Sequence, residues 1–365
     1  MGATYIYRLA PRTAFHFGLR GVGVEETATF CPADTLFSAL CLTLREWESD
    51  GNRKLETWLD EFPPLSGGGS PPLRISSAFP YAGEVLFFPK PRVPANLPVE
   101  TRQTEAKTLK RIDYVSHGIL KAWLAQEDLN AQVDDELLLH DGRVWVTRDE
   151  LGELEDFRDL DTKKHRMWAT QTRPRVTVDR ATARSSIYQA GVVSFRPGAG
   201  LFTLVEFLDG EVEKERGRLA SLLEVLGHSG LGGERSSGYG QFEPEAPQEF
   251  DGFGAADGDL FLTLAPYHPT RTEVEAGVLG KDAAYDLLTR RGWVGSPEGL
   301  HLRRRLVRLL GEGSVLHDVG GASYGDLADV TPREGDEEML SHKVWRYGIA
   351  FPVPAARPVE KGEAE

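Results

Sequence analysis

The apolar positions of the chain follow two different periods. Near the N-terminus, Tyr5, Tyr7 and Leu9 alternate with other residues, which predicts a strand. From Asp34 the apolar residues recur at helical spacing, which predicts an amphipathic helix with Asp34 as its N-cap and Gly51 just beyond its end. The apolar stripe of this helix comprises Leu36, Phe37, Leu40, Leu44 and Trp47.

The same two periods continue in the second half of the chain. Strand patterns cover 192–195 and 201–208, and leucines at helical spacing predict a helix over about 213–226. The resulting order of strand, helix, long insertion, strand pair, helix and strand is that of a ferredoxin-like (split βαβ) domain. After a Pro- and acid-rich linker at 243–259, a second α+β unit is expected to begin at 260–264 and to contain a helix at about 281–290 and a strand at 342–351. Over 302–310, arginines alternate with apolar positions.

The length of 365 residues fits two domains. We expect an α+β protein with an N-terminal domain over 1–250 and a C-terminal domain over 251–354. Residues 63–98 are rich in proline and glycine and predict irregular connections around a short strand at 85–88. The charged tail at 355–365 is expected to be disordered.

The net charge of −14 argues against a protein that coats nucleic acid without specificity. Its distribution along the chain changes that picture. Residues 126–157 contain eleven acidic residues and two arginines, a local net charge of −9, which is typical of a solvated face. Residues 158–184 then contain eight basic and three acidic residues, a local net charge of +5. A local basic groove is therefore compatible with the acidic total.

Two cysteines, Cys31 and Cys41, are too few for a disulfide framework or a cysteine-based zinc site. The first residues show no secretory signal, and the longest apolar runs are far too short to span a membrane. We therefore expect a cytoplasmic protein with no membrane partner. No nucleophile triad, HExxH motif or metal-ligand spacing is visible, so no catalytic residue, metal or other cofactor is expected.

The densest candidate site is a glycine-rich loop at 227–240, with six glycines in fourteen residues. Glycine lets a backbone adopt positive φ and approach a partner closely, and Arg235, Ser236 and Ser237 add donors for phosphate. The loop is not a nucleotide P-loop, because it leads from a helix into a strand and lacks the Gly-Lys-Ser/Thr signature. The alternative is a long helix C-cap and turn.

The basic stretch 158–184 lies among His165, Trp168 and Tyr188, a mixture that suits single-stranded nucleic acid. Arg173 and Arg175 alternate as in a strand and would share one face. The alternative is a solvated strand whose arginines pair with the neighbouring acidic run.

His16 ends the first predicted strand region and has several possible roles. It could contact RNA, simply pack, or act as the general base of an RNA cleavage with Lys163, Lys164 or Arg235 as its cationic partner.

Together these motifs resemble the RAMP superfamily of CRISPR proteins. The resemblance is carried by Phe15–Gly18, Asp34–Leu40 and the glycine-rich Leu231–Gly240. Further matching segments narrow it to the family that forms subunit four of the Csm complex, the type III-A CRISPR effector: Val178–Arg180, Ile187–Tyr188, Tyr285–Leu288 near Gly292–Trp293, and His342–Gly348.

The resemblance implies two ferredoxin-like (RRM-like) domains with an inserted β-hairpin thumb within about 85–185. It implies a non-catalytic subunit that holds the 5′ handle of the CRISPR RNA (crRNA). It also implies a heteromeric ribonucleoprotein in which the chain joins a large polymerase-like subunit to the backbone subunits. The residues expected to bind RNA are His16, Gly18, Lys110, Arg111, His165, Arg173, Arg175, Arg180, Tyr188, Gly232, Gly233, Arg235, Ser236 and Ser237.

Two alternative functions remain open. One is a metal-independent endoribonuclease of the same superfamily that processes CRISPR RNA, with His16 as its base. The other is a protein-only scaffold, in which the basic segments meet acidic surfaces of partner proteins.

Overall fold

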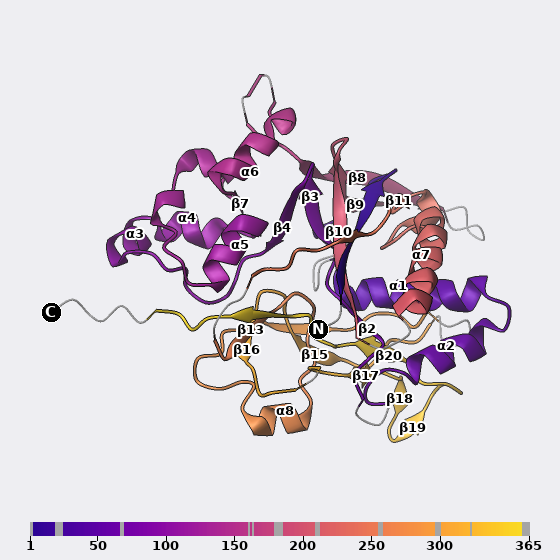
Figure 1. The fold of residues 1–365 in the computed structure, drawn as a ribbon. Coiled ribbons are helices and arrows are strands. Elements are labelled where there is room, and N and C mark those ends of the chain that lie inside the picture. The colour runs from indigo at the N-terminus through magenta and orange to yellow at the C-terminus, as the bar shows by residue number, and fades with distance from the viewer. Residues whose placement is uncertain are drawn as a thin grey trace.

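A computed structural model gives the fold of the chain (Figure 1). It describes residues 3–18, 25–65, 69–159, 161–162, 164–178, 185–208, 212–254, 258–295, 301–321 and 323–359. The expected mixed α+β class is confirmed by a large sheet, several two- and three-stranded sheets and eight α-helices within those ranges. None of the helices in this part of the chain is long and apolar enough to cross a membrane.

The core of the large sheet is antiparallel. Its strands lie in the order β11 (Phe242–Pro244), β1 (Thr4–Pro11), β10 (Ala199–Phe207) and β3 (Phe79–Ala82), so the first strand of the chain pairs with strands about 200 residues later. The sheet continues through β4, β5, β7 and β6, and two short strands pair with its centre: β4 Val85–Pro89, β5 Tyr114–Ser116, β7 Val144–Trp145, β6 Leu138–Leu139, β2 Leu73–Ile75 and β12 Gln248–Glu249.

Two long helices, α1 (Ala33–Trp47) and α7 (Val212–Ser229), lie beside the core strands (Figure 1). Both predicted helices are confirmed, but two details differ. Pro32 is the N-cap of α1, and Asp34 is the second helical residue, fully buried rather than capping. Trp47 was expected in the apolar stripe and is instead two-thirds exposed, because the helix extends past the core by its last turn. Helix α2 (Gly51–Leu59) follows.

An insertion between β4 and β10 forms the upper left of Figure 1 and then a long hairpin. Up to residue 157 it is mostly helical, and its exposed surface carries much of the acidic run. The hairpin pairs β8 (Trp168–Val178) with β9 (Ser185–Phe195) over eleven residue pairs. The helices of the insertion are α3 Val99–Thr104, α4 Ala106–Arg111, α5 His117–Leu124, α6 Arg148–Glu153 and the 3₁₀ turns η1 Asn130–Gln132, η2 Asp135–Leu137 and η3 Glu155–Phe157.

The C-terminal part lies below the large sheet in Figure 1 and consists of small sheets. The helix expected at 281–290 is wrong, because Leu287–Arg290 pairs instead with the strand at 307–310. The single α-helix among the described residues after 258 is six residues long. The elements are β13 Leu260–Thr263, α8 Arg271–Ala276, β14 Leu287–Arg290, β15 Val307–Leu310, β16 Val315–His317, β17 Leu327–Asp329, β18 Arg333–Glu334, β19 Glu337–Glu338, β20 Trp345–Tyr347 and β21 Pro352–Ala355.

Residues 355–359 do not fit the expectation of a disordered tail. The Ala356 amide donates to Leu124 O at 2.8 Å, and the Arg357 guanidinium pairs with Asp259. The rest of the expected tail, from 360, lies outside the described residues. The two halves of the chain are also joined by buried polar contacts, among them Asp34 with Arg290 at 3.1 Å and Ser77 Oγ donating to Glu312 at 2.6 Å.

Candidate nucleic-acid interface

The glycine-rich loop leaves α7 and folds directly against the segment that follows β1. The Gly233 amide donates to His16 O at 2.9 Å, and the Gly240 amide donates to Ala14 O at 2.8 Å. Gly232 has φ +97°, and a Cβ at this position would lie 2.5 Å from His16 O. Glycine is therefore required at Gly232 both by the left-handed backbone and by the close approach of another chain segment.

His16 is buried beneath this loop. Its Nδ1 lies 2.6 Å from Gly191 O in β9, so Nδ1 carries a proton and donates to this carbonyl. Gly18 lies beside it, where a Cβ would be 3.7 Å from the His16 Nε2. His16 thus connects the end of the β1 segment, the glycine-rich loop and the hairpin.

The β8–β9 hairpin lies across the same loop. The Arg175 guanidinium lies 4.7 Å from the centroid of the Tyr239 ring, and Arg173 Nη1 lies 3.5 Å from the Tyr239 hydroxyl. On the opposite strand, the Tyr188 hydroxyl donates to the Glu234 carboxylate at 3.0 Å, and this carboxylate raises the pKa of Tyr188. Arg173 and Arg175 therefore share one face, as the alternation predicts.

These contacts bring most of the predicted RNA-binding residues to one surface, here named the hairpin–loop surface. Its outer part is exposed at Arg173 and throughout the turn Arg235–Ser237. The surface comprises His16, Gly18, Arg173, Arg175, Tyr188, Gly232, Gly233, Arg235, Ser236 and Ser237. Arg180 falls outside the described residues.

Three predicted residues lie elsewhere. Lys110 and Arg111 end helix α4, where Arg111 donates to Asp141 O at 3.3 Å. The backbone of His165 forms an isolated β-bridge with Arg158 in the turn that precedes β8, and burial lowers the pKa of His165. The contacts of Arg111 and His165 are thus with the insertion and the base of the hairpin, so Lys110, Arg111 and His165 are not part of the hairpin–loop surface.

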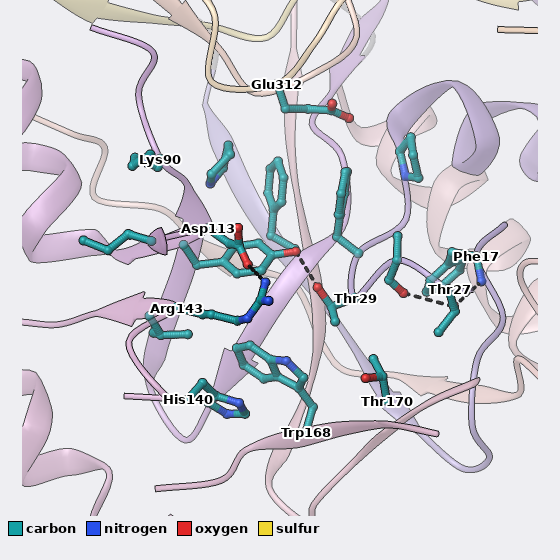
Figure 2. A pocket seen from close by; sticks show the side chains of 18 of the residues that line it. Phe17, Thr27, Thr29, Lys90, Asp113, His140, Arg143, Trp168, Thr170 and Glu312 are labelled. Atoms are coloured by element: carbon teal, nitrogen blue, oxygen red, sulfur yellow. Dashed lines mark hydrogen bonds and ion pairs between the residues drawn. The ribbon is translucent and has the colours of Figure 1, made fainter. Parts of the chain in front are cut away.

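A pocket of about 1110 Å³ opens near Gly18, between the insertion, the base of the hairpin and the C-terminal part. Figure 2 shows Trp168 beside His140 on one wall and the ion pair between Arg143 and Asp113 on another. The Trp168 and His140 rings are stacked with their centroids 4.3 Å apart. The sequence pointed to Trp168 as a candidate residue but did not predict the pocket, because the walls of the pocket come from segments far apart in the chain.

Cations outnumber carboxylates in the pocket lining. Burial lowers the pKa of Lys90 and raises the pKa of Glu312, so both groups have a weakened preference for their charged forms. The cations are Lys90, Arg92, Arg143, Arg166, Arg196 and Arg290, against Asp113, Asp141, Asp286 and Glu312. Flat rings beside guanidinium groups are chemically suited to an unstacked base and its phosphate. No group of three or more His, Cys, Asp or Glu in the described ranges is arranged to hold a metal ion.

Comparison with known proteins identifies relatives of the chain. Residues 256–355 match the model of the CRISPR Csm4 C-terminal domain. The CRISPR system Cms protein Csm4 of Thermococcus onnurineus is 29% identical over 336 residues, which cover 89% of this chain and 92% of that protein. The Csm4 protein of Mycobacterium tuberculosis is 28% identical over 305 residues, covering 82% and 84%.

Solved structures agree in fold. The chain from a Csm3-Csm4 subcomplex of the type III-A CRISPR-Cas interference complex aligns with a TM-score of 0.66 at 16% identity, covering 96% of this chain and 99% of that chain. A chain from a Csm1-Csm4 cassette in complex with pppApA aligns with a TM-score of 0.56 at 22% identity, covering 97% and 99%. These matches confirm the resemblance read from the sequence: the chain is similar to Csm4 proteins of CRISPR systems over most of its length, and its residues 256–355 match the Csm4 C-terminal domain.

Proposed function

We propose that this chain is a non-catalytic, RNA-binding subunit of a cytoplasmic type III-A CRISPR effector complex, where it holds the 5′ handle of crRNA. One observation carries the proposal. The β8–β9 hairpin presents Arg173, Arg175 and Tyr188 beside the glycine-rich loop, whose exposed turn adds Arg235 and two serines. Arginines, hydroxyls and exposed amides contact phosphates, and the neighbouring rings offer faces for bases.

The pocket beside Gly18 extends this interface. A continuous strand of RNA crossing the hairpin–loop surface would pass near its mouth, because Gly18 belongs to both. The pocket volume of about 1110 Å³ is ample for one unstacked nucleotide. We propose that a handle nucleotide enters it, with Arg143 or Arg166 near the phosphate and Trp168 near the base.

We also propose the assembly role that the family resemblance implies. The related solved structures contain Csm4 with Csm3 and Csm4 with Csm1, so the partners proposed for this chain are a backbone subunit and a large polymerase-like subunit. In fold terms, the order β11–β1–β10–β3, with α1 and α7 as the crossover helices, supports a ferredoxin-like N-terminal unit. The hairpin is then its inserted thumb, and an RRM-like C-terminal domain stays a prediction.

The absence of catalysis is part of the proposal. The His16 ring is buried, and its Nδ1 is already bonded to Gly191 O, which suits a positioning role better than that of a general base. Lys164, one of the cations considered for cleavage, pairs with Asp141 at 2.9 Å.

The test is binding of the purified full chain to RNA that begins with the repeat-derived 5′ handle, measured by fluorescence anisotropy over a range of salt. Wild-type affinity should fall with salt, because bound phosphates release counterions. Arg173→Ala and Arg175→Ala should each weaken binding roughly five- to twenty-fold and lower the salt slope. Arg271→Ala is the matched control, since this exposed arginine lies on α8 and pairs with Glu275.

Circular dichroism of each variant checks that the fold is kept. RNA binding that ignores salt, or that is the same in all three variants, would contradict the proposal and favour the protein scaffold. Cleavage of the RNA in EDTA that is lost in His16→Ala would favour the endoribonuclease.

A further inference from the structure

A second arginine-rich ribbon lies in the C-terminal part, far along the chain from the hairpin. It pairs β14 with β15, and a bridge between Trp293 and Arg303 prolongs it beyond Arg290 and Val307. The two faces of the ribbon differ sharply in exposure. One face turns towards the body of the protein, and the other is open to solvent.

The inner face is anchored by a buried carboxylate that two arginines share. Leu309 is completely buried, and the Arg290 guanidinium reaches Asp34 at the start of α1 at 3.1 Å. Arg346, from β20, pairs with the other oxygen of the same carboxylate. The ribbon is therefore held against the N-terminal half by a buried ion-pair network.

The outer face exposes large apolar side chains. Leu287 is 60% exposed, Trp293 57%, Leu306 55% and Tyr285 40%. Soluble proteins rarely leave several such side chains together in solvent, and a cluster of them marks an interaction site. The surface ends near Leu310, which is buried where it pairs with Tyr267.

The same face carries cations without carboxylate partners. The Arg303 guanidinium lies 4.7 Å from the centroid of the Trp293 ring. No ion pair joins any of the exposed arginines of this face to a carboxylate within the described residues; they are Arg291, Arg303 and Arg308. In a chain with a net charge of −14, uncompensated cations gathered on one ribbon require an explanation. Trp, Tyr and Arg are also the residues most enriched at the energetic centres of protein interfaces.

We infer that the outer face of this ribbon docks a partner protein whose surface combines apolar side chains with carboxylates. The surface, here named the ribbon surface, comprises Tyr285, Leu287, Arg291, Trp293, Arg303, Leu306 and Arg308. The exposed leucines of this surface favour a protein over RNA as its binding partner. Leu287 and Leu306 offer neither a flat ring for a base nor a donor for a phosphate, but they bury well against an apolar protein surface. The uncompensated arginines then select an acidic partner.

The inference rests on the proposed function only in its choice of partner, a subunit of the effector complex. The experiment co-expresses the tagged full chain with the other complex subunits and crRNA, and compares hydroxyl-radical labelling of the purified assembly with that of the free chain. Labelling of Trp293 and Leu306 should fall at least five-fold in the assembly and stay low after RNase treatment. Trp293→Ala and Arg308→Glu should each lower incorporation at least ten-fold.

Val274→Ala and Arg271→Glu are the controls, because both residues are exposed on α8 away from the ribbon, and incorporation should not change. The variants should also bind handle RNA as the wild type does. If the chain enters the assembly while Trp293 stays labelled, or its protection disappears with RNase, the docking inference is overturned and the proposed function stands. If the chain co-purifies with no other subunit, the assembly role falls, and the docking inference falls with it.

Discussion

The β8–β9 hairpin and the β14–β15 ribbon share an architecture but differ in the side chains that surround their arginines. Both are two-stranded antiparallel elements outside the large sheet, and both carry several arginines. On the hairpin, Arg173 and Arg175 lie beside hydroxyls and glycines, and among its described side chains the large exposed apolar residues are one cross-strand pair, Val176 and Ile187. On the ribbon, arginines alternate with four large exposed apolar side chains.

The lesson is that arginine content alone does not indicate the ligand. Polar neighbours and accessible backbone around an arginine suit phosphate, whereas aliphatic neighbours suit a protein surface. The two elements also differ in how they are held. Buried charge anchors the ribbon, through Asp34, while packing and close backbone contact anchor the hairpin, through Trp168 and Gly191.

The largest effect is expected from breaking the anchor of the ribbon. Asp34 is completely buried between Arg290 and Arg346, and burial together with the nearby Arg346 lowers the pKa of Arg304 to about 10. Asp34→Asn would leave these cations in the interior without a counter-charge. The free energy of unfolding, measured with urea, should fall by about 3–5 kcal/mol.

The matched control is Glu275→Gln, which removes the carboxylate of an exposed pair with Arg271 and should leave stability nearly unchanged. Equal stability of the two variants would show that the ribbon is not anchored by buried charge.

The sequence could predict elements that depend on local patterns, but not contacts between residues far apart in the chain. The elements whose signal is local were found: the stripe of α1, the leucine pattern of α7, the glycine-rich loop and the alternating arginines of β8. Asp34 was expected to cap its helix because it stands near a helix start. Its real partners are 256 and 312 residues away, and no local pattern encodes them.

Strand β14 shows the same limit. Leu287 and Leu288 fit a helix as well as a strand, and pairing with β15, about twenty residues later, decides the outcome. The hairpin and the loop were each predicted, but not the contact of Arg175 with Tyr239. The pocket was not predicted at all, because it exists only once four distant segments meet.

The stacking of His140 on Trp168 at the base of the hairpin should make the stability of the protein depend on pH. Burial, aided by the nearby Arg166, lowers the pKa of His140 to about 4, and its Nε2 accepts from the Met167 amide at 3.0 Å. The folded state therefore holds a neutral ring, while the unfolded chain takes up a proton near pH 6.5. The contribution of His140 to the free energy of unfolding is therefore fully present above about pH 6.5. It is lost as the pH drops towards 4, which lowers the free energy of unfolding by at most about 3 kcal/mol.

Urea unfolding at pH 7.0 and pH 4.5 measures the fall. His117 and His165 also have pKa values lowered by burial and act in the same direction, so the test is the difference between wild type and His140→Asn. Asparagine suits the left-handed backbone at this position, where φ is +51°. The variant should be less stable at pH 7.0 and lose less on acidification. The same loss in both proteins would remove His140 as a source of the pH dependence.

The smallest effect is expected from the backbone contact that anchors the hairpin–loop surface. Gly232 and Gly238 both have positive φ, of +97° and +81°, so an alanine at either position strains the backbone by about 1 kcal/mol. They differ in their surroundings, because a Cβ at Gly238 meets nothing within 4 Å, whereas one at Gly232 would lie 2.5 Å from His16 O. Gly232→Ala should therefore cost about 1 kcal/mol more than Gly238→Ala in urea unfolding and, by displacing the loop, should also weaken handle RNA binding. If the two variants behave alike in both assays, the close approach of the loop to His16 contributes neither to stability nor to RNA binding.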